Sequence, residues 1–367
     1  MKKYLLTVAS LLMALTILAT TLSGCTSNST STSTTTSPTT TTTTPTTQTI
    51  TDMDGRTVII PAPALLHNVA VLTSPQIIDM YVIGEQSKLC AVTNAVKQWS
   101  LLKEIDPRIS SIPAVRSSAA QINIEALLQS NPDLCIGSQT DMQVVEKSTS
   151  IPCLEIATNQ TSNFIQAQID EVTFLGKVFG QQAKAAKYAA YLNNTTSSVT
   201  SALTGLSQNQ RLKVYMGLNA DHLTTYGGAT YMDEWIGTAG CVNAAHSVTA
   251  TSASEGGLST VSPEQILNWN PDIILLDTGK PADLYNDPTW SKISAVQNKK
   301  VYVLPVGMFL WDRPSPEAAA MLPKWLSLTA YPDRFKNTDM PTELKKFYSD
   351  IFGYTMTDAD VKTILGQ

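Results

Sequence analysis

The sequence has few of the features that mark an enzyme or a nucleic-acid-binding protein. Only 15% of its 367 residues are charged, no basic run stands out, and the formal net charge is −5. Because nucleic-acid binding usually needs a basic patch, we expect no nucleic-acid partner. The chain also lacks a G-x-S-x-G elbow, an H-E-x-x-H zinc motif and a phosphate-binding glycine loop. We therefore predict a protein that is not an enzyme.

Histidine is scarce, with His67, His222 and His246 far apart in the sequence, and no C-x-x-C pair occurs. Zinc and manganese sites need several histidine, cysteine or carboxylate ligands that converge on the ion. We therefore predict no metal site and no cofactor. His222 stays open as an axial ligand to haem or cobalt, although a solvated loop histidine is the simpler interpretation.

Cysteine is nearly as scarce, and most of the cysteines stand in apolar, strand-like runs. We expect those of the folded body to be small buried hydrophobic side chains. A disulfide between neighbouring strands is an alternative that the sequence leaves open. The four residues concerned are Cys90, Cys135, Cys153 and Cys241.

The N-terminus has the layout of an export signal. Lys2 and Lys3 precede an apolar stretch over residues 4–22, and Leu22-Ser23-Gly24-Cys25 closes it. A cysteine directly after Ser-Gly resembles the lipobox of lipoproteins. We predict a signal peptide over 1–24, a lipid anchor on Cys25 and a body on the outer face of the cytoplasmic membrane. An uncleaved N-terminal membrane helix is the alternative.

A Thr/Ser-rich tract follows the anchor and runs to residue 49. It is broken by Pro38 and Pro45 and has no apolar side chain to bury. Such a tract cannot form a core. We predict that residues 25–49 form the lipid anchor and a solvated linker.

Strand-like and helical patterns alternate through the rest of the chain, starting with two short strands around Asp54-Gly55. One alternating series ends near residue 162 and another begins near 207, with helical pattern alone between them. Alternation predicts βαβ units and parallel sheet. The expected fold is α/β: an N-terminal lobe over 50–162, a helical bridge over 163–206 and a C-terminal lobe over 207–367. The two mostly parallel sheets are joined by one long rigid helix, over 181–206.

The chain repeats one unit, at residues 122–134 and again at 261–273. Each copy has Asn or Ser at an expected helix N-cap, Glu in the first turn, and Asn-Pro-Asp before an apolar strand. One copy in each half indicates two lobes of similar construction.

Together these features resemble the class III substrate-binding proteins of ABC importers, which serve ferric siderophores, haem and cobalamin. The resemblance covers residues 50–367 and rests on the opening hairpin, the repeated unit, the bridging helix and the run at 231–245. In that run Cys241 stands where the family usually has a second glycine. The resemblance implies a ligand cleft between two lobes and small closure motions. It also implies an ABC permease as partner, an iron complex or corrinoid as ligand, and a protein that is a monomer.

The resemblance assigns one docking carboxylate to each lobe, Glu125 and Glu264, to pair with arginines of the permease. Exposed charges steer docking and fix orientation. A glutamate in a first helical turn also simply favours the helix dipole. Glu317, in Ser315-Pro316-Glu317, has the same arrangement outside the repeat.

Loops after the predicted strands supply the candidate ligand-binding residues. An aromatic ring beside a guanidinium suits a large, flat or anionic metal complex. The alternative for each is an ordinary loop residue or a partly buried aromatic. The candidates are Trp99, Arg116, Tyr226, Trp311 and Arg313.

Two other functions compete with ligand capture for import. One is an extracellular lipid-anchored enzyme, for which paired carboxylates would suffice, and the other is a surface scaffold. The alternating α/β organisation favours a ligand cleft over a β-sandwich adhesin.

Overall fold

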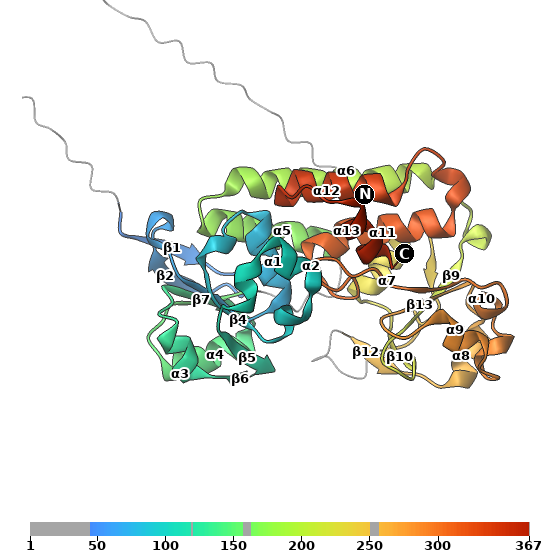
Figure 1. Cartoon of the computed structure of the whole chain (residues 1–367), viewed down its shortest axis with the longest axis horizontal. Helices are drawn as coiled ribbons and strands as arrows, with labels where there is room; N and C mark the ends of the chain where they lie inside the picture. Colours follow the sequence, from blue (N-terminus) through green and yellow to red (C-terminus); the bar gives the residue numbers. More distant parts are fainter. Residues whose placement is uncertain (1–44, 119, 157–162, 250–256, 367) are drawn as a thin grey trace, which may run out of the picture. The chain divides into compact units, whose positions relative to one another are not determined.

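The computed structural model describes residues 45–118, 120–156, 163–249 and 257–366 (Figure 1). Cys25, the predicted signal peptide and most of the predicted linker lie outside these residues. The described body opens with the predicted hairpin, in which β1 (Thr47–Thr51) pairs antiparallel with β2 (Thr57–Pro61). β1 begins inside the segment predicted as linker, because its polar residues gain backbone partners across the hairpin.

The first lobe contains a six-stranded sheet that is parallel except at its last pair, β5–β6. In spatial order the strands are β6 (Gln121–Ile122), β5 (Ala114–Ser118), β4 (Leu89–Thr93), β3 (Val69–Val71), β7 (Leu134–Gly137) and β8 (Cys153–Glu155). The helices around it are α1 (Ser74–Val82), α2 (Ser100–Ile105), α3 (Ile124–Gln129) and α4 (Gln139–Ser148).

The second lobe is built around a four-stranded, fully parallel sheet. Its strands are β11 (Val242–Asn243), β9 (Lys213–Gly217), β13 (Ile273–Leu276) and β14 (Val301–Val303), and β10 (Thr224–Tyr226) pairs with β12 (Leu258–Thr260) separately. Its helices are α7 (Tyr231–Thr238), α8 (Pro263–Trp269), α9 (Pro281–Tyr285), α10 (Ser294–Gln297), α11 (Pro316–Ala330), α12 (Met340–Phe347) and α13 (Asp358–Leu365).

The central strands β3, β7 and β13 are buried on both faces, which explains why they read as continuous apolar runs. Successive side chains of a strand point to opposite faces. In β13, Ile273 and Leu275 join the largest core, whereas Ile274 and Leu276 join a second core with Trp290. The α/β fold with mostly parallel sheets is thus confirmed.

The repeated unit has the same local structure in both lobes. Asn123 and Ser262 cap α3 and α8 by accepting a hydrogen bond from a first-turn backbone N–H. After each helix an asparagine has φ +46°, a left-handed conformation that asparagine tolerates. The following aspartate then accepts a backbone N–H at the start of a neighbouring central strand, β3 or β9. The distances are 2.8 Å from Asn68 N to Asp133 Oδ2 and 2.8 Å from Lys213 N to Asp272 Oδ2.

A helical hairpin, α5 (Phe164–Val178) and α6 (Gln182–Ala202), joins the lobes (Figure 1). The 21 residues of α6 span about 32 Å. α6 ends four residues before the predicted boundary, and Gly205 beyond it has φ +78°. α5 packs closely against α6, because a side chain on Gly176 would lie 2.6 Å from the Ala185 Cβ.

Both helices contact both lobes. At the start of α5, the Glu234 carboxylate of α7 accepts the backbone N–H groups of Phe164 and Ile165 at 2.9 and 3.0 Å. At its end, Gln48 of the opening hairpin donates to the Val178 carbonyl at 2.9 Å. The bridge is therefore a pair of helices, of which the predicted long helix is one.

The cysteines of the described residues are free thiols. Cys135, Cys153 and Cys241 are buried, as expected, and Cys90 is half-buried. Cys135 and Cys153 are opposite one another on β7 and β8, and burial raises the pKa of the Cys135 thiol well above its usual value.

Candidate functional site

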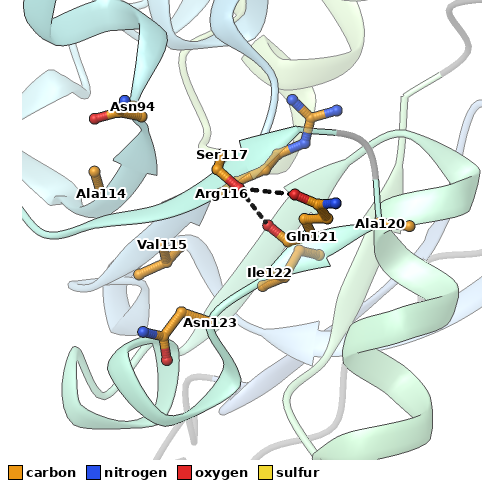
Figure 2. A pocket seen from close by; sticks show the side chains of 9 residues that line it. All are labelled: Asn94, Ala114, Val115, Arg116, Ser117, Ala120, Gln121, Ile122 and Asn123. Atoms are coloured by element: carbon orange, nitrogen blue, oxygen red, sulfur yellow. Dashed lines mark hydrogen bonds between the residues drawn. The ribbon is translucent and has the colours of Figure 1, made fainter.

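The first lobe has a cavity of about 490 Å³ beside β5 and β6 (Figure 2). The cavity lies partly at the carboxyl ends of parallel strands, where open α/β sheets bind ligands. Its volume falls within the range of small-molecule sites. The residues that line it are Asn94, Ala114, Val115, Arg116, Ser117, Ala120, Gln121, Ile122 and Asn123.

Arg116 is the cationic residue of this cavity and is held by a fully buried carboxylate. Its Nε lies 2.9 Å from Asp141 Oδ2, an ion-pair distance, although the N–H direction makes no hydrogen bond. Asp141 is itself fixed by Ser138 Oγ, which donates to Oδ2 at 2.8 Å, and by the backbone N–H of Ala120 at 3.1 Å. Figure 2 shows the guanidinium extending away from Ile122 and Asn123. Its terminal nitrogens have no hydrogen-bond partner among the described residues, so they are free for a ligand.

A second polar cluster lies on the C-terminal lobe, where Tyr226 and Tyr231 meet the loop between β14 and α11. The two hydroxyl groups donate to the backbone carbonyl of Asp312 at 2.9 and 3.0 Å. Arg313 Nη1 donates to the Tyr226 hydroxyl and to the Asp312 carboxylate. The predicted residues Tyr226 and Arg313 are therefore in direct contact, with 39% of the Arg313 side chain exposed.

The electrostatics of this cluster keep Arg313 charged. Burial opposes the charge, but Tyr226 and Asp312 outweigh it, so the pKa of Arg313 is raised above its usual value. Burial also raises the pKa of Tyr226 and Tyr231, which keeps both phenols neutral. Burial raises the pKa of Asp312 as well, against the opposing charge of Arg313. Arg313 of the second lobe and Arg116 of the first thus each pair with a buried aspartate, as Arg56 and Arg108 of the first lobe also do.

Sequence reasoning missed Asp141 and Asp312, the partners of the two arginines, and also Asp277. Asp277 follows β13 and accepts the backbone N–H of Asn219 at 3.2 Å. Its second carboxylate oxygen is buried and has no hydrogen-bond partner in the described part of the chain. Its position directly after an apolar strand was the available signal for a residue at the ligand edge of the sheet.

The two predicted tryptophans are largely buried. Trp99, 7% exposed, packs edge-to-face on Phe309 of the second lobe with ring centroids 4.7 Å apart. Trp311 is 1% exposed and contacts Glu317. Trp99 therefore joins a loop of the first lobe to a loop of the second, and Trp311 belongs to the core of the second.

His222, for which a solvated loop position was the simpler interpretation, is instead buried at 6% exposure. Its ring lies edge-on to Trp290, and its Nδ1 has no partner among the described residues. His222 has φ +56°, and the packing of its ring against Trp290 buries it. Across the described ranges, no group of three or more histidine, cysteine or acidic side chains gathers in a way that fits a metal ion.

Glu125 and Glu264 are exposed and occupy the same position in α3 and α8, two residues after the N-cap. The pKa of Glu264 is lowered by hydrogen bonds from the backbone N–H of Glu264 itself and from Ser262, so Glu264 is charged at neutral pH.

None of the helices in the described part of the chain is long and apolar enough to cross a membrane.

The fold and the sequence define one class of protein. The sequence model of the periplasmic binding protein family matches residues 69–306, and the chain belongs to this family. Its members are the substrate-binding proteins of ABC transporters, so the chain is a binding protein that acts outside the cytoplasm with a permease partner. At the level of the family it is not an enzyme.

Among individual proteins, the chain is similar to the molybdate-binding protein MolA of Haemophilus influenzae, with 26% identity over 83% of this chain and 90% of MolA. The crystal structure of MolA with bound molybdate superimposes with a TM-score of 0.72, at 23% identity over 84% of this chain and 99% of that one. A periplasmic solute-binding protein of Veillonella parvula superimposes with a TM-score of 0.74, at 25% identity over 87% and 97% of the two chains. Helicobacter pylori CeuE, solved as a nickel–histidine complex, gives a TM-score of 0.70 at 21% identity over 87% and 99%.

Proposed function

We propose that the protein captures an anionic metal species between Arg116 and Arg313 and delivers it to an ABC permease. One observation carries this proposal: each lobe holds an arginine by a buried aspartate, Asp141 or Asp312, and leaves guanidinium nitrogens for a ligand. A guanidinium held this way is pre-oriented for carboxylate, catecholate or oxyanion oxygens.

The ligand that the cavity favours is a metal chelate, namely a ferric siderophore, haem or a corrinoid with acidic groups. A cavity of about 490 Å³ is larger than a bare tetrahedral oxyanion requires. Molybdate is the second candidate, because MolA is similar over most of its length.

A panel of molybdate, a ferric catecholate, a ferric hydroxamate, haem and cobalamin tests the proposal by thermal shift and calorimetric titration. The true ligand at a hundredfold excess over its Kd should raise the free energy of unfolding by about 2.7 kcal/mol. Arg116→Ala and Arg313→Ala should each weaken binding at least about tenfold, since each removes a charge-assisted contact.

The matched control is Arg108→Ala, because Arg108 also pairs with an aspartate, Asp106, at 2.6 Å. It should leave ligand affinity unchanged. High-affinity binding that tolerates both Arg116→Ala and Arg313→Ala would overturn the assignment of the site.

We further propose that Cys25 carries the lipid anchor and that Glu125 and Glu264 dock on the permease. The first is supported by the export signal that ends in Leu22-Ser23-Gly24-Cys25. The second is supported by exposure and by the matched positions of the two carboxylates in α3 and α8. Loss of both carboxylates should lower affinity for the permease and leave ligand affinity intact.

A further inference from the structure

The repeated unit exposes an apolar side chain at the same place in both lobes. The described residues include five large hydrophobic side chains that are exposed: Ile59, Leu65, Leu128, Leu267 and Val303. Leu128 in α3 is 52% exposed and Leu267 in α8 is 37% exposed. Each stands three residues after the glutamate of its copy, Glu125 or Glu264.

The match extends through the whole turn of helix. Three and four residues along a helix bring side chains onto one face. That face therefore carries an exposed carboxylate, an exposed leucine and an exposed amide in each lobe, the amides being Gln129 and Asn268. Between them Leu127 and Ile266, both fully buried, fix the helix to its lobe.

The two helices are also held in place by the same local interactions. The N-cap before each helix, the left-handed asparagine after it and the aspartate that accepts backbone N–H groups recur in both copies. The side chains of the two faces thus leave their lobes in the same local geometry. A single exposed leucine is ordinary on a protein surface. Two exposed leucines at equivalent positions, each beside an exposed carboxylate, call for a common explanation.

We infer that Leu128 and Leu267 are the apolar anchors of a two-point docking surface, one on each lobe, and that its occupant is the permease. Two copies of one face on a single chain match a partner that presents the same complementary surface twice, as a dimer of like subunits does. The chemistry of each face calls for a basic side chain beside an apolar recess on each permease subunit. The charge steers the encounter and sets orientation, and the desolvated leucine supplies affinity.

This inference rests on the proposed docking of Glu125 and Glu264, and the experiment separates the two. The full chain is titrated onto the ABC permease that imports its ligand, reconstituted in nanodiscs, with binding and stimulated ATP hydrolysis as readouts. Leu128→Ala and Leu267→Ala should each weaken permease binding at least about fivefold, and the double variant more. Leu128→Met, which keeps an apolar side chain of similar size, should retain binding.

Leu65→Ala is the matched control, because Leu65 is 44% exposed and lies outside the repeat. It should bind the permease as the unchanged protein does, and all variants should keep their ligand affinity and melting temperature. If Glu125→Ala and Glu264→Ala weaken docking while both leucine variants bind normally, the anchoring role of the leucines is refuted and the carboxylate docking stands. If neither pair matters, both proposals fall.

Discussion

The role of a single residue in this protein depends on how deeply its side chain is buried and on its neighbours, and Glu317 is the clearest example. Its carboxylate has no solvent exposure and accepts hydrogen bonds from the Tyr348 hydroxyl at 2.7 Å and the Met308 backbone N–H at 3.0 Å. Burial raises its pKa to about 7, although these hydrogen bonds oppose the shift. Its position two residues after an N-cap is the same as that of Glu125 and Glu264, so burial alone separates this internal acid from the two surface carboxylates.

Glu317 should make stability depend on pH. An unfolded chain releases this proton near the ordinary pKa of 4.5, whereas the folded protein keeps it to about pH 7. The stabilisation by neutral Glu317 is therefore complete below about pH 4.5 and is lost as the pH rises through 7, by at most about 3 kcal/mol.

Urea denaturation at pH 5 and pH 8 measures this effect in the unchanged protein and in Glu317→Gln. The glutamine variant removes the titrating group, so its free energy of unfolding should fall less between the two pH values. The same fall in both proteins would exclude Glu317 as the source, since the other buried acids, such as Asp79 and Glu171, are common to both.

At the scale of elements, the start of α5 depends on a side chain from another helix. The first backbone N–H groups of a helix have no partner within it. Asn163, which precedes α5, is in a left-handed conformation and makes no side-chain cap. Glu234 of α7 replaces that cap with both carboxylate oxygens.

Glu234→Ala should therefore lower the free energy of unfolding by about 2 kcal/mol, because two backbone donors lose a charged acceptor. Chemical denaturation followed by circular dichroism measures the change. Glu125→Ala is the control: Glu125 is exposed in a first helical turn, and among the described residues its side chain is hydrogen-bonded only by Gln129 of its own helix. Equal stability of the two variants would contradict the capping role.

For the whole molecule, the proposed lipid anchor would hold the binding protein at the membrane surface. The signal-like segment predicts that the mature chain begins at Cys25 with lipid attached. Mass spectrometry of the N-terminal peptide from the membrane fraction should find residues 1–24 absent and an acyl mass on Cys25. Cys25→Ala should lose this mass. A peptide that retains Met1 in the unchanged protein would establish the uncleaved helix instead.

The sequence predicted the fold further than it predicted the site. The repeat, the opening hairpin and the helical stretch are local patterns, and local hydrogen bonding and apolar periodicity decide them. The contact between Arg313 and Tyr226 joins residues far apart in the chain and depends on how β10 meets the loop before α11. Arg116 likewise finds its aspartate on α4. The burial of Trp311 and His222 also follows from packing that no local pattern encodes.

The paired helices α5 and α6 have a mechanical consequence. Because two antiparallel helices, each in contact with both lobes, join the two sheets, bending one requires sliding it along the other. We therefore expect ligand binding to change the distance between α3 and α8 only slightly. A permease that docks on α3 and α8, as we propose, would then have to distinguish the loaded from the empty protein by a small change in their spacing or angle. This discrimination would depend on how closely the two permease subunits fit the distance between the two helices.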